Sequence, residues 1–261
     1  MFFAIWKTDS RQGNPHIMRI AIISDIHANI EALEAVFADI SRQKIDETVC
    51  LGDIVGYGAN PNECIDLVKK SCSLIILGNH DAAAIGLLST DHFNVHAKIA
   101  IDWTAENLSP DSQSFLRSLP LKENKYSHAF VHATPYEPNM WYYITSLEEA
   151  AFNFQFFETV FCFVGHTHIP IIIVLENEKE VYVHQSNEIK YPEMTQARFL
   201  INVGSVGQPR DRNSKACYGI LDTDTELFSY VRVAYDITKT QNKMRKIKMP
   251  DFLVTRLVDG R

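Results

Sequence analysis

Three short apolar runs stand at similar intervals in the first third of the chain. They cover residues 18–24, 48–51 and 73–77, and each stops abruptly at a glycine or a polar residue. Apolar runs of this length without alternation are typical of strands that are covered on both faces. The pattern therefore predicts three buried strands.

The segments between these runs have the apolar period of a helix. Residues 29–43 and 61–71 each place their apolar side chains on one face, with Asn29 at an N-cap position and Pro61 in the first turn. Alternation of strand and helix predicts parallel pairing through right-handed crossovers. In such sheets, ligands bind just beyond the carboxyl ends of the strands.

The alternation is interrupted over residues 82–120, which look helical in two pieces (102–107 and 109–118), and we expect a cap inserted near the site. Afterwards a helix is predicted over 148–158 and a closing helix over 235–247. The second half is expected to be mostly antiparallel sheet. Its predicted strands are 127–131, 159–164, 169–175, 181–184, 199–203, 217–221 and 227–233.

Polar motifs follow five of the predicted strands. Together they offer two lone carboxylates, one amide and four imidazoles, with a further histidine beside the amide. This donor set suits two divalent metals and leaves one imidazole for proton transfer. A single aspartate after a strand is more often a turn former, so the order of all five motifs carries the prediction. The motifs are Asp25-Ile-His27, Gly52-Asp53, Gly78-Asn79-His80-Asp81, His132 and Gly165-His166-Thr167-His168.

These motifs resemble the pattern of the calcineurin-like metallophosphoesterase superfamily, which reads DxH, GD, GNH(D/E), H and GHxH. All five blocks are present in order over residues 25–168. The resemblance implies the α/β fold class, as a four-layer αββα sandwich of two mixed sheets with a helical cap insertion. It also implies a metal-dependent phosphoric ester hydrolase in which a metal-bridging hydroxide attacks phosphorus.

The resemblance implies a role for each motif residue. Asp25, His27 and His168 would hold the first metal, and Asp53 would bridge both metals. The donors are oxygen and imidazole without thiolate, a set that suits Mn, Fe or Zn.

The second metal would be held by Asn79, His132 and His166, again as the resemblance implies. His80 would be catalytic, facing the leaving group and protonating the departing oxygen. Asp81 has two interpretations: it orients a ligand or a loop, or it caps a helix over 82–87, which we favour.

The second block departs from the pattern of phosphoprotein phosphatases, GDxVDRG. Gly56 stands at the position of the aspartate that pairs with the catalytic histidine, and Tyr57 stands at that of the arginine that grips phosphate. A bidentate arginine is not easily replaced, which disfavours a phosphoprotein substrate. The chain is similar instead to a bacterial subgroup of small phosphodiesterases, some of them like asymmetric diadenosine tetraphosphate hydrolases. The segments that carry this similarity are 52–65, 103–109, 115–120, 131–144 and 202–211.

Several residues are candidates for substrate contacts. Tyr57, Arg210 and Arg212 could meet the phosphate. The loop 204–207 either offers backbone amides to a phosphate or is merely a tight turn. The aromatic run 141–143 either stacks a nucleobase or packs in the core, and we favour the core.

Composition narrows the class of protein. The chain has 261 residues and a net charge of −7, so we expect neither a membrane partner nor extended nucleic acid. Five scattered cysteines without a CxxC pair indicate reduced thiols and a cytoplasmic location. We expect residues 1–17 to be a non-core N-terminal extension and 18–261 a single domain. No pattern sets an oligomeric state.

The sequence thus predicts a dinuclear metal-dependent phosphoesterase acting on small phosphodiester or nucleotide substrates. One alternative is a serine/threonine-type phosphoprotein phosphatase in which Arg210 or Arg212 grips the phosphate. Another is a non-catalytic scaffold of the same fold. Scaffolds usually lose metal ligands, and this chain keeps every one of them, so we rank this alternative last.

Overall fold

The N-terminal strands and helices form where the apolar pattern predicts them. The structure is a computed structural model that describes residues 18–191 and 197–261. Asn29 caps the first helix, since its side-chain oxygen accepts a hydrogen bond from the N–H of Ala32 at 3.2 Å. The elements of this part are β1 (Arg19–Ile23), α1 (Ile30–Ile40), β2 (Glu47–Cys50), α2 (Pro61–Ser71) and β3 (Leu74–Ile75).

The first sheet has six strands in the order β3-β2-β1-β11-β12-β9. β1 pairs in parallel with β2 and antiparallel with β11, so it lies at the centre of a mixed sheet. The strands contributed by the C-terminal half are β9 (Glu188–Lys190), β11 (Ala216–Asp222) and β12 (Leu227–Val233).

The second sheet has the order β4-β5-β6-β10-β7-β8. Its three central strands, β5, β6 and β10, are parallel, whereas the outer pairs are antiparallel. The second half is thus mostly antiparallel, as predicted, with parallel pairs among β5, β6 and β10. The strands are β4 (Lys122–Lys125), β5 (His128–Val131), β6 (Phe161–Val164), β7 (Ile171–Glu176), β8 (Glu180–His184) and β10 (Arg198–Asn202).

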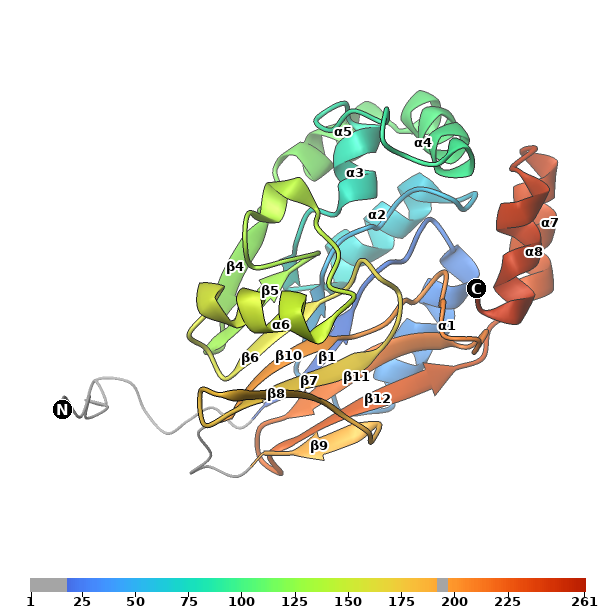
Figure 1. Cartoon of the computed structure of the whole chain (residues 1–261). Helices are drawn as coiled ribbons and strands as arrows, with labels where there is room; N and C mark the ends of the chain where they lie inside the picture. Colours follow the sequence, from blue (N-terminus) through green and yellow to red (C-terminus); the bar gives the residue numbers. More distant parts are fainter. Residues whose placement is uncertain (1–17, 192–196) are drawn as a thin grey trace.

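The two sheets face each other, with helices on both outer faces (Figure 1). Ile20 and Ile22 of β1 pack with Phe163 in the core between the sheets, while Ala21 and Ile23 pack under α1. Both faces of β1 are thus buried, which explains its unbroken apolar run. The outer face of the second sheet is covered by α6 (Leu147–Asn153). The predicted four-layer sandwich of two mixed sheets is confirmed.

Three helices between β3 and β4 form the helical cap (Figure 1). The last two end close to the predicted pieces, but α4 begins earlier, where Asn94 caps it through the N–H groups of His96 and Ala97. The cap helices are α3 (Asn79–Ala84), α4 (Val95–Asn107) and α5 (Pro110–Arg117). Short 3-10 helices lie at Pro138–Met140 and Phe154–Phe156.

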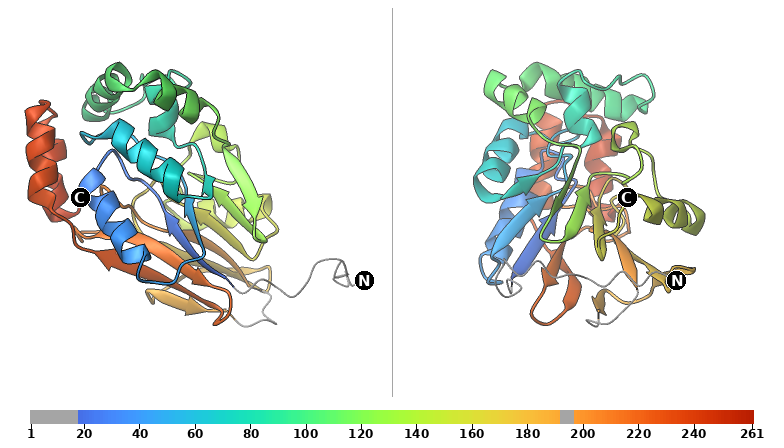
Figure 2. Two further views of the ribbon diagram at one scale, coloured as in Figure 1. Left: turned by 180° about the vertical axis from the view of Figure 1, so that it is seen from behind. Right: turned by 90° about the vertical axis from the view of Figure 1, so that its left-hand side faces the viewer.

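The C-terminal end forms two helices, α7 (Ile237–Lys246) and α8 (Asp251–Asp259), where the sequence predicted one. Leu253 and Leu257 of α8 pack in one apolar cluster with Ala97 and Ala100 of α4. The two helices stand together beside the cap (Figure 2). The last helix therefore supports the cap from the side.

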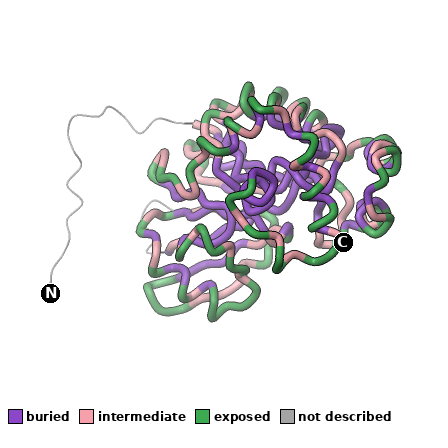
Figure 3. Tube along the Cα trace, turned by 90° about the horizontal axis from the view of Figure 1, so that it is seen from above, coloured by how far each residue is buried: buried purple, intermediate pink, exposed green. Residues whose placement is uncertain are grey.

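Seen from above, the buried part of the trace gathers in the middle of the molecule, and exposed segments surround it (Figure 3). The five cysteines are free thiols. In the described part of the chain, no helix is long and apolar enough to cross a membrane. The predicted extension, residues 1–17, lies outside the described residues, and the division into extension and single domain stays a prediction.

Candidate metal centre

The five motifs meet at one end of the two sheets. Asp25 follows β1 and Asp53 follows β2, while His132 follows β5. Asn79 opens α3 just after β3, and the pair His166 and His168 follows β6. All seven predicted ligands are buried, with at most 7% of the surface of any of them exposed. The carboxyl ends of the strands therefore bring these side chains together, as the topology requires.

The first group of ligand atoms comes from Asp25, His27, Asp53 and His168, which could hold one metal ion. The Nε2 atoms of His27 and His168 lie 3.0 Å apart. Asp25 Oδ1 lies 3.3 Å from Nε2 of His168, and Asp53 Oδ2 lies 3.7 Å from Nε2 of His27. These four side chains converge on one point.

The second group comes from Asp53, His132 and His166. His132 Nε2 lies 3.3 Å from Asp53 Oδ2 and 3.1 Å from the side-chain oxygen of Asn79. Nε2 of His166 is buried and has no hydrogen-bond partner among the described residues. Asp53 belongs to both groups, so the arrangement is that of two neighbouring metal positions.

Three of the imidazoles are oriented by backbone carbonyls behind them. Nδ1 of His27 lies 3.1 Å from Val55 O, and Nδ1 of His132 lies 2.9 Å from Leu51 O. Nδ1 of His168 lies 2.6 Å from the carbonyl of Gln208. A carbonyl can only accept, so each Nδ1 carries a proton. Nε2 of His27 and of His168 therefore presents its lone pair to the centre, and Nε2 of His132 would do so once a metal displaces its proton.

Acceptor atoms consequently face one another across the centre. The two Nε2 lone pairs of His27 and His168 meet at 3.0 Å. Buried acceptors without a donor between them are unfavourable. A divalent cation would remove this conflict, because each of these atoms would then donate a lone pair to it. The residues present therefore fit a pair of metal ions.

The backbone of these loops is bent into unusual conformations. Five of the seven predicted ligands have positive φ angles: Asp25, His27, Asp53, His166 and His168. A side chain in the left-handed region costs roughly 1–3 kcal/mol and persists only where neighbouring structure holds it. Hydrogen bonds between the loops do so, among them Asp25 N to Gly52 O at 3.0 Å and His27 N to Asp53 O at 2.9 Å. Such strain is typical of functional sites.

Burial and charge set the protonation states. Burial opposes ionisation of Asp25 and Asp53, but neighbouring imidazoles outweigh it and lower the pKa of both carboxyls. Burial lowers the pKa of His27, and that of His166 falls to about 3. For His132, burial is outweighed by Asp53, and the pKa rises to about 9. Apart from His132, whose proton a metal would displace, these are the forms that bind metal.

Asp81 does not cap the helix that follows it. Its carboxylate, fully buried at the third position of α3, accepts hydrogen bonds from Val55 N at 3.0 Å and Gly78 N at 3.1 Å. It therefore ties the loop after Asp53 to the start of the helix that carries Asn79. The favoured interpretation as an N-cap is wrong, and the alternative, orientation of a loop, fits these contacts.

The small-residue loop 204–207 is a structural turn. The N–H groups of Val206 and Gly207 donate to the carbonyls of Ser24 and Asp25, each at 2.9 Å. Gly204 N donates to the side-chain oxygen of Asn202. These amides already donate hydrogen bonds within the protein, so they do not bind a phosphate. The segment 204–207 instead supports the loop that carries Asp25.

His80 lies against aromatic rings beside the centre. Its ring centroid is 4.5 Å from that of Tyr57, 4.8 Å from that of His27 and 5.4 Å from that of Phe93. Its Nδ1 has no hydrogen-bond partner among the described residues. Burial lowers the pKa of His80 to about 4, although the Asp53 carboxylate opposes the shift. Packing against these rings thus orients the imidazole, although Gly56 stands where the phosphoprotein phosphatase pattern has an aspartate.

A cavity of about 430 Å³ opens directly beside this centre. Asn79, His80 and His166 form one side of it, and the cap segment 88–97 forms another. The third side is the segment 140–143. A substrate in this cavity would reach the candidate ligands and His80 together.

Of the three predicted substrate contacts, Tyr57 lines the cavity, Arg210 lies near Tyr57, and Arg212 lies apart from both. Tyr57 is 5% exposed and lines the cavity. The guanidinium of Arg210 lies 6.0 Å from the ring of Tyr57, and its Nε is buried without a partner among the described residues. Arg212 is exposed, and its N–H donates to Gly260 O, so the structure places it at the C-terminal end of the chain.

Some residues at the cavity escaped the sequence analysis. Tyr142 and Tyr143 are 43% and 52% exposed, so the prediction of core packing is wrong for them, whereas Trp141 does pack against a core cluster. The ring of Tyr143 lies 4.1 Å from that of His166. His92, which no motif singled out, lines the cavity, whereas His96 stacks on Phe252 of α8. The only sequence signal was the aromatic run itself.

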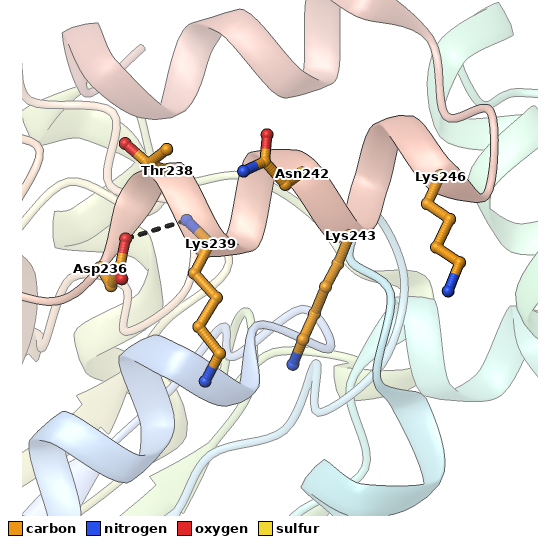
Figure 4. A pocket seen from close by; sticks show the side chains of 6 residues that line it. All are labelled: Asp236, Thr238, Lys239, Asn242, Lys243 and Lys246. Atoms are coloured by element: carbon orange, nitrogen blue, oxygen red, sulfur yellow. Dashed lines mark hydrogen bonds between the residues drawn. The ribbon is translucent and has the colours of Figure 1, made fainter.

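A second hollow, of about 350 Å³, lies along α7 (Figure 4). Two of its three lysines already have a partner, since Lys239 and Lys243 hold the Glu31 carboxylate at 3.3 and 2.5 Å. Asp236 caps the helix through Lys239 N. These contacts explain the two lysines as helix attachments, and none of the predicted ligands lines this hollow.

Comparison with known proteins identifies the family. Residues 18–226 match the model of the calcineurin-like phosphoesterase superfamily domain. An uncharacterised protein of Methanocaldococcus jannaschii is 42% identical over 93% of this chain and 98% of its own length. The symmetrical bis(5'-nucleosyl)-tetraphosphatase of Actinobacillus pleuropneumoniae is 30% identical over only 44% of this chain and 45% of its own.

Solved structures agree. A metallophosphoesterase from Sphaerobacter thermophilus superposes with a TM-score of 0.82 at 42% identity, over 94% of this chain and all of its own. A protein of Pyrococcus horikoshii has the same fold, with a TM-score of 0.75 at 20% identity, over 93% and 98% of the two chains. The chain belongs to the calcineurin-like phosphoesterase superfamily, and it is a metal-dependent phosphoric ester hydrolase.

Proposed function

We propose that the protein hydrolyses small phosphodiesters or nucleotides with two divalent metal ions. One ion is held by Asp25, His27 and His168, and Asp53 is shared with the second. The contact of lone pairs between His27 and His168 is the observation that carries this proposal, because only a cation between them makes the buried arrangement favourable.

The second ion is held by Asn79, His132 and His166. When bound, the two ions supply Lewis acidity and a hydroxide nucleophile at neutral pH. Asn79 contributes no charge, so Asp25 and Asp53 supply the only two negative charges among the ligands. Two divalent ions exceed this charge, and the centre stays cationic and attracts an anionic ester. Mn²⁺, Fe and Zn²⁺ all suit this donor set.

His80 gives its proton to the departing oxygen. Burial keeps the imidazole neutral in the free protein, and an anionic ester beside it counteracts this and favours the imidazolium form. The ring is already fixed by Tyr57 and Phe93, so it does not have to be ordered when substrate binds. Arg210 lies close enough to Tyr57 to contact a second phosphate oxygen.

A phosphodiester or nucleotide is preferred over a phosphoprotein because Gly56 and Tyr57 replace the aspartate and arginine of the phosphoprotein phosphatase pattern. The free thiols support a cytoplasmic location.

The proposal is tested by hydrolysis of bis-p-nitrophenyl phosphate and p-nitrophenyl phosphate by metal-stripped protein supplied again with Mn²⁺. We expect the diester to be cleaved only with metal. Asp53→Asn should abolish this activity and lower the metal content, while far-ultraviolet circular dichroism stays unchanged.

Full activity of Asp53→Asn would contradict the two-metal centre. Cleavage of the monoester alone would favour a phosphatase over a phosphodiesterase. Metal content measured by mass spectrometry on the same samples separates loss of the ions from loss of the chemistry.

A further inference from the structure

The cavity beside His80 has aromatic rings on several sides. Phe93 comes from the cap loop, and its ring lies 5.4 Å from that of His80. Trp141 and Tyr143 come from the segment after the 3-10 helix Pro138–Met140, and the ring of Tyr143 lies 4.1 Å from that of His166. These rings lie within reach of a group that is attached to a phosphate at the centre.

The remaining lining combines the apolar side chains of Leu88, Ala97 and Met140 with polar groups, and it lacks acidic groups. Ser89, His92 and Asn94 of the cap loop contribute hydroxyl, imidazole and amide groups. Among the described residues that line the cavity, none has a carboxylate. A neutral planar ring with hydrogen-bonding atoms on its edge matches this lining better than an aliphatic or a cationic group does.

The size of the cavity sets the extent of the occupant. A volume of about 430 Å³ exceeds what a single phenyl ring fills and is near the lower end of the roughly 300–1,000 Å³ range of ligand pockets. One nucleoside fits in it. Two nucleosides joined by a polyphosphate do not, so the remainder of such a molecule would extend past the centre into solvent.

We propose that this cavity binds the nucleobase of a nucleoside phosphoester against the rings of Phe93, Trp141 and Tyr143, while Ser89, His92 and Asn94 meet its polar edge. This assignment rests on the proposed function, since the phosphate is taken to lie at the metal centre. It makes these residues determinants of specificity, and Phe93 in addition holds the ring of His80.

Tyr143 and Tyr142 allow a matched test. They are adjacent, of the same type and similarly exposed, but only Tyr143 lines the cavity, since the ring of Tyr142 stacks on Tyr136 at 6.2 Å. Binding of AMP, ribose 5-phosphate and phenyl phosphate to the protein loaded with Mn²⁺ is measured by calorimetry, with release of inorganic phosphate assayed in parallel. This readout does not depend on turnover of a diester.

We expect AMP to bind at least about tenfold more tightly than either smaller ester, since base stacking on an aromatic side chain is worth on the order of tenfold in affinity. Tyr143→Leu and Phe93→Leu should each remove about tenfold more of the affinity for AMP than of that for ribose 5-phosphate, since both esters share the phosphate site that these rings border. Tyr142→Leu should change neither affinity.

Equal binding of AMP and ribose 5-phosphate by the wild-type protein would overturn the proposal. So would equal losses in Tyr142→Leu and Tyr143→Leu. Phenyl phosphate binding as tightly as AMP would assign the cavity to a simple aryl ester instead. If bis-p-nitrophenyl phosphate is cleaved while AMP shows no base-dependent affinity, this inference fails and the proposed function stands. If AMP shows base-dependent affinity while bis-p-nitrophenyl phosphate is not cleaved, the nucleobase cavity stands and diester hydrolysis fails.

Discussion

Gly56 faces the ring of His80 so closely that no larger residue fits between them. Its φ is +90°, and a Cβ atom on it would lie 2.4 Å from Nδ1 of His80. An aspartate at position 56 would therefore collide with the imidazole in its present position. Only glycine at position 56 leaves room for the imidazole of His80 to pack as it does.

Gly56→Ala should therefore damage the reaction more than the fold. Displacing the imidazole by about 1 Å can cost on the order of 10²-fold in turnover. Gly86→Ala is the matched control, because Gly86 also has a positive φ of +73° but has nothing within 4 Å of a built Cβ. Steady-state kinetics on the diester should show the loss in the first variant and none in the second. Equal turnover in both variants would contradict this account of His80.

His80→Ala tests whether the imidazole acts on the leaving group or holds metal. Loss of a general acid slows turnover by about 10²–10⁴-fold. The metal content should stay that of the wild type, as measured by mass spectrometry after gel filtration. Loss of metal in this variant would make His80 a ligand.

The donor residues could be predicted from the sequence because each is fixed by a short motif next to a strand. Asp25, Asp53 and His132 needed only the strand ends to bring them together. For Asp81 and for the loop 204–207 the sequence offered two interpretations each and could not decide between them, because both roles depend on backbone partners far away in the chain. The exposure of Tyr143 could not be predicted either, because an aromatic run is also typical of a core segment.

At the scale of the elements, length and pattern decided what could be predicted. The long apolar helices and buried strands have their own periodicity. β4 (Lys122–Lys125) and β9 (Glu188–Lys190) are short, polar edge strands that exist through pairing with their neighbours. α8 (Asp251–Asp259) is too short to be stable alone, so its formation depends on packing against α4 and α7.

The packing of α8 can be measured with two adjacent residues. Leu257 is buried in the cluster that α8 shares with α4, while Val258 is 57% exposed. Leu257→Ala should lower the free energy of unfolding by about 2–5 kcal/mol. Val258→Ala should change it by no more than about 0.5 kcal/mol. Urea unfolding followed by circular dichroism compares them, and similar losses in both would mean that α8 is not docked as described.

For the whole molecule, stability in acid depends on a histidine away from the centre. His128 begins β5, is 7% exposed and meets the rings of Phe161 and Phe163 edge-on. Burial lowers its pKa from 6.5 to about 4. His128 therefore takes up a proton below about pH 6.5 in the unfolded chain, but only below about pH 4 in the folded protein.

Stability should accordingly fall as the pH falls from 6.5 to 4, by up to about 3 kcal/mol from this residue. His128→Phe removes the titrating group and should flatten the dependence of unfolding free energy on pH in this window. Urea unfolding at several pH values gives both curves. Because the other histidines are present in both proteins, the difference between the curves reports His128 alone, and parallel curves would contradict its assignment.

The central place of β1 in its sheet has a consequence for how the protein is made. All the candidate ligands have left the ribosome once residue 168 has emerged, but β1 still lacks β11, which is residues 216–222. The carbonyl of Gln208, which orients His168, is also missing at that point. Since domains generally fold as units during synthesis, the ligand loops stay unsupported until β11 has emerged. Under the proposed function, loading with metal thus follows the synthesis of β11 and not that of the last ligand.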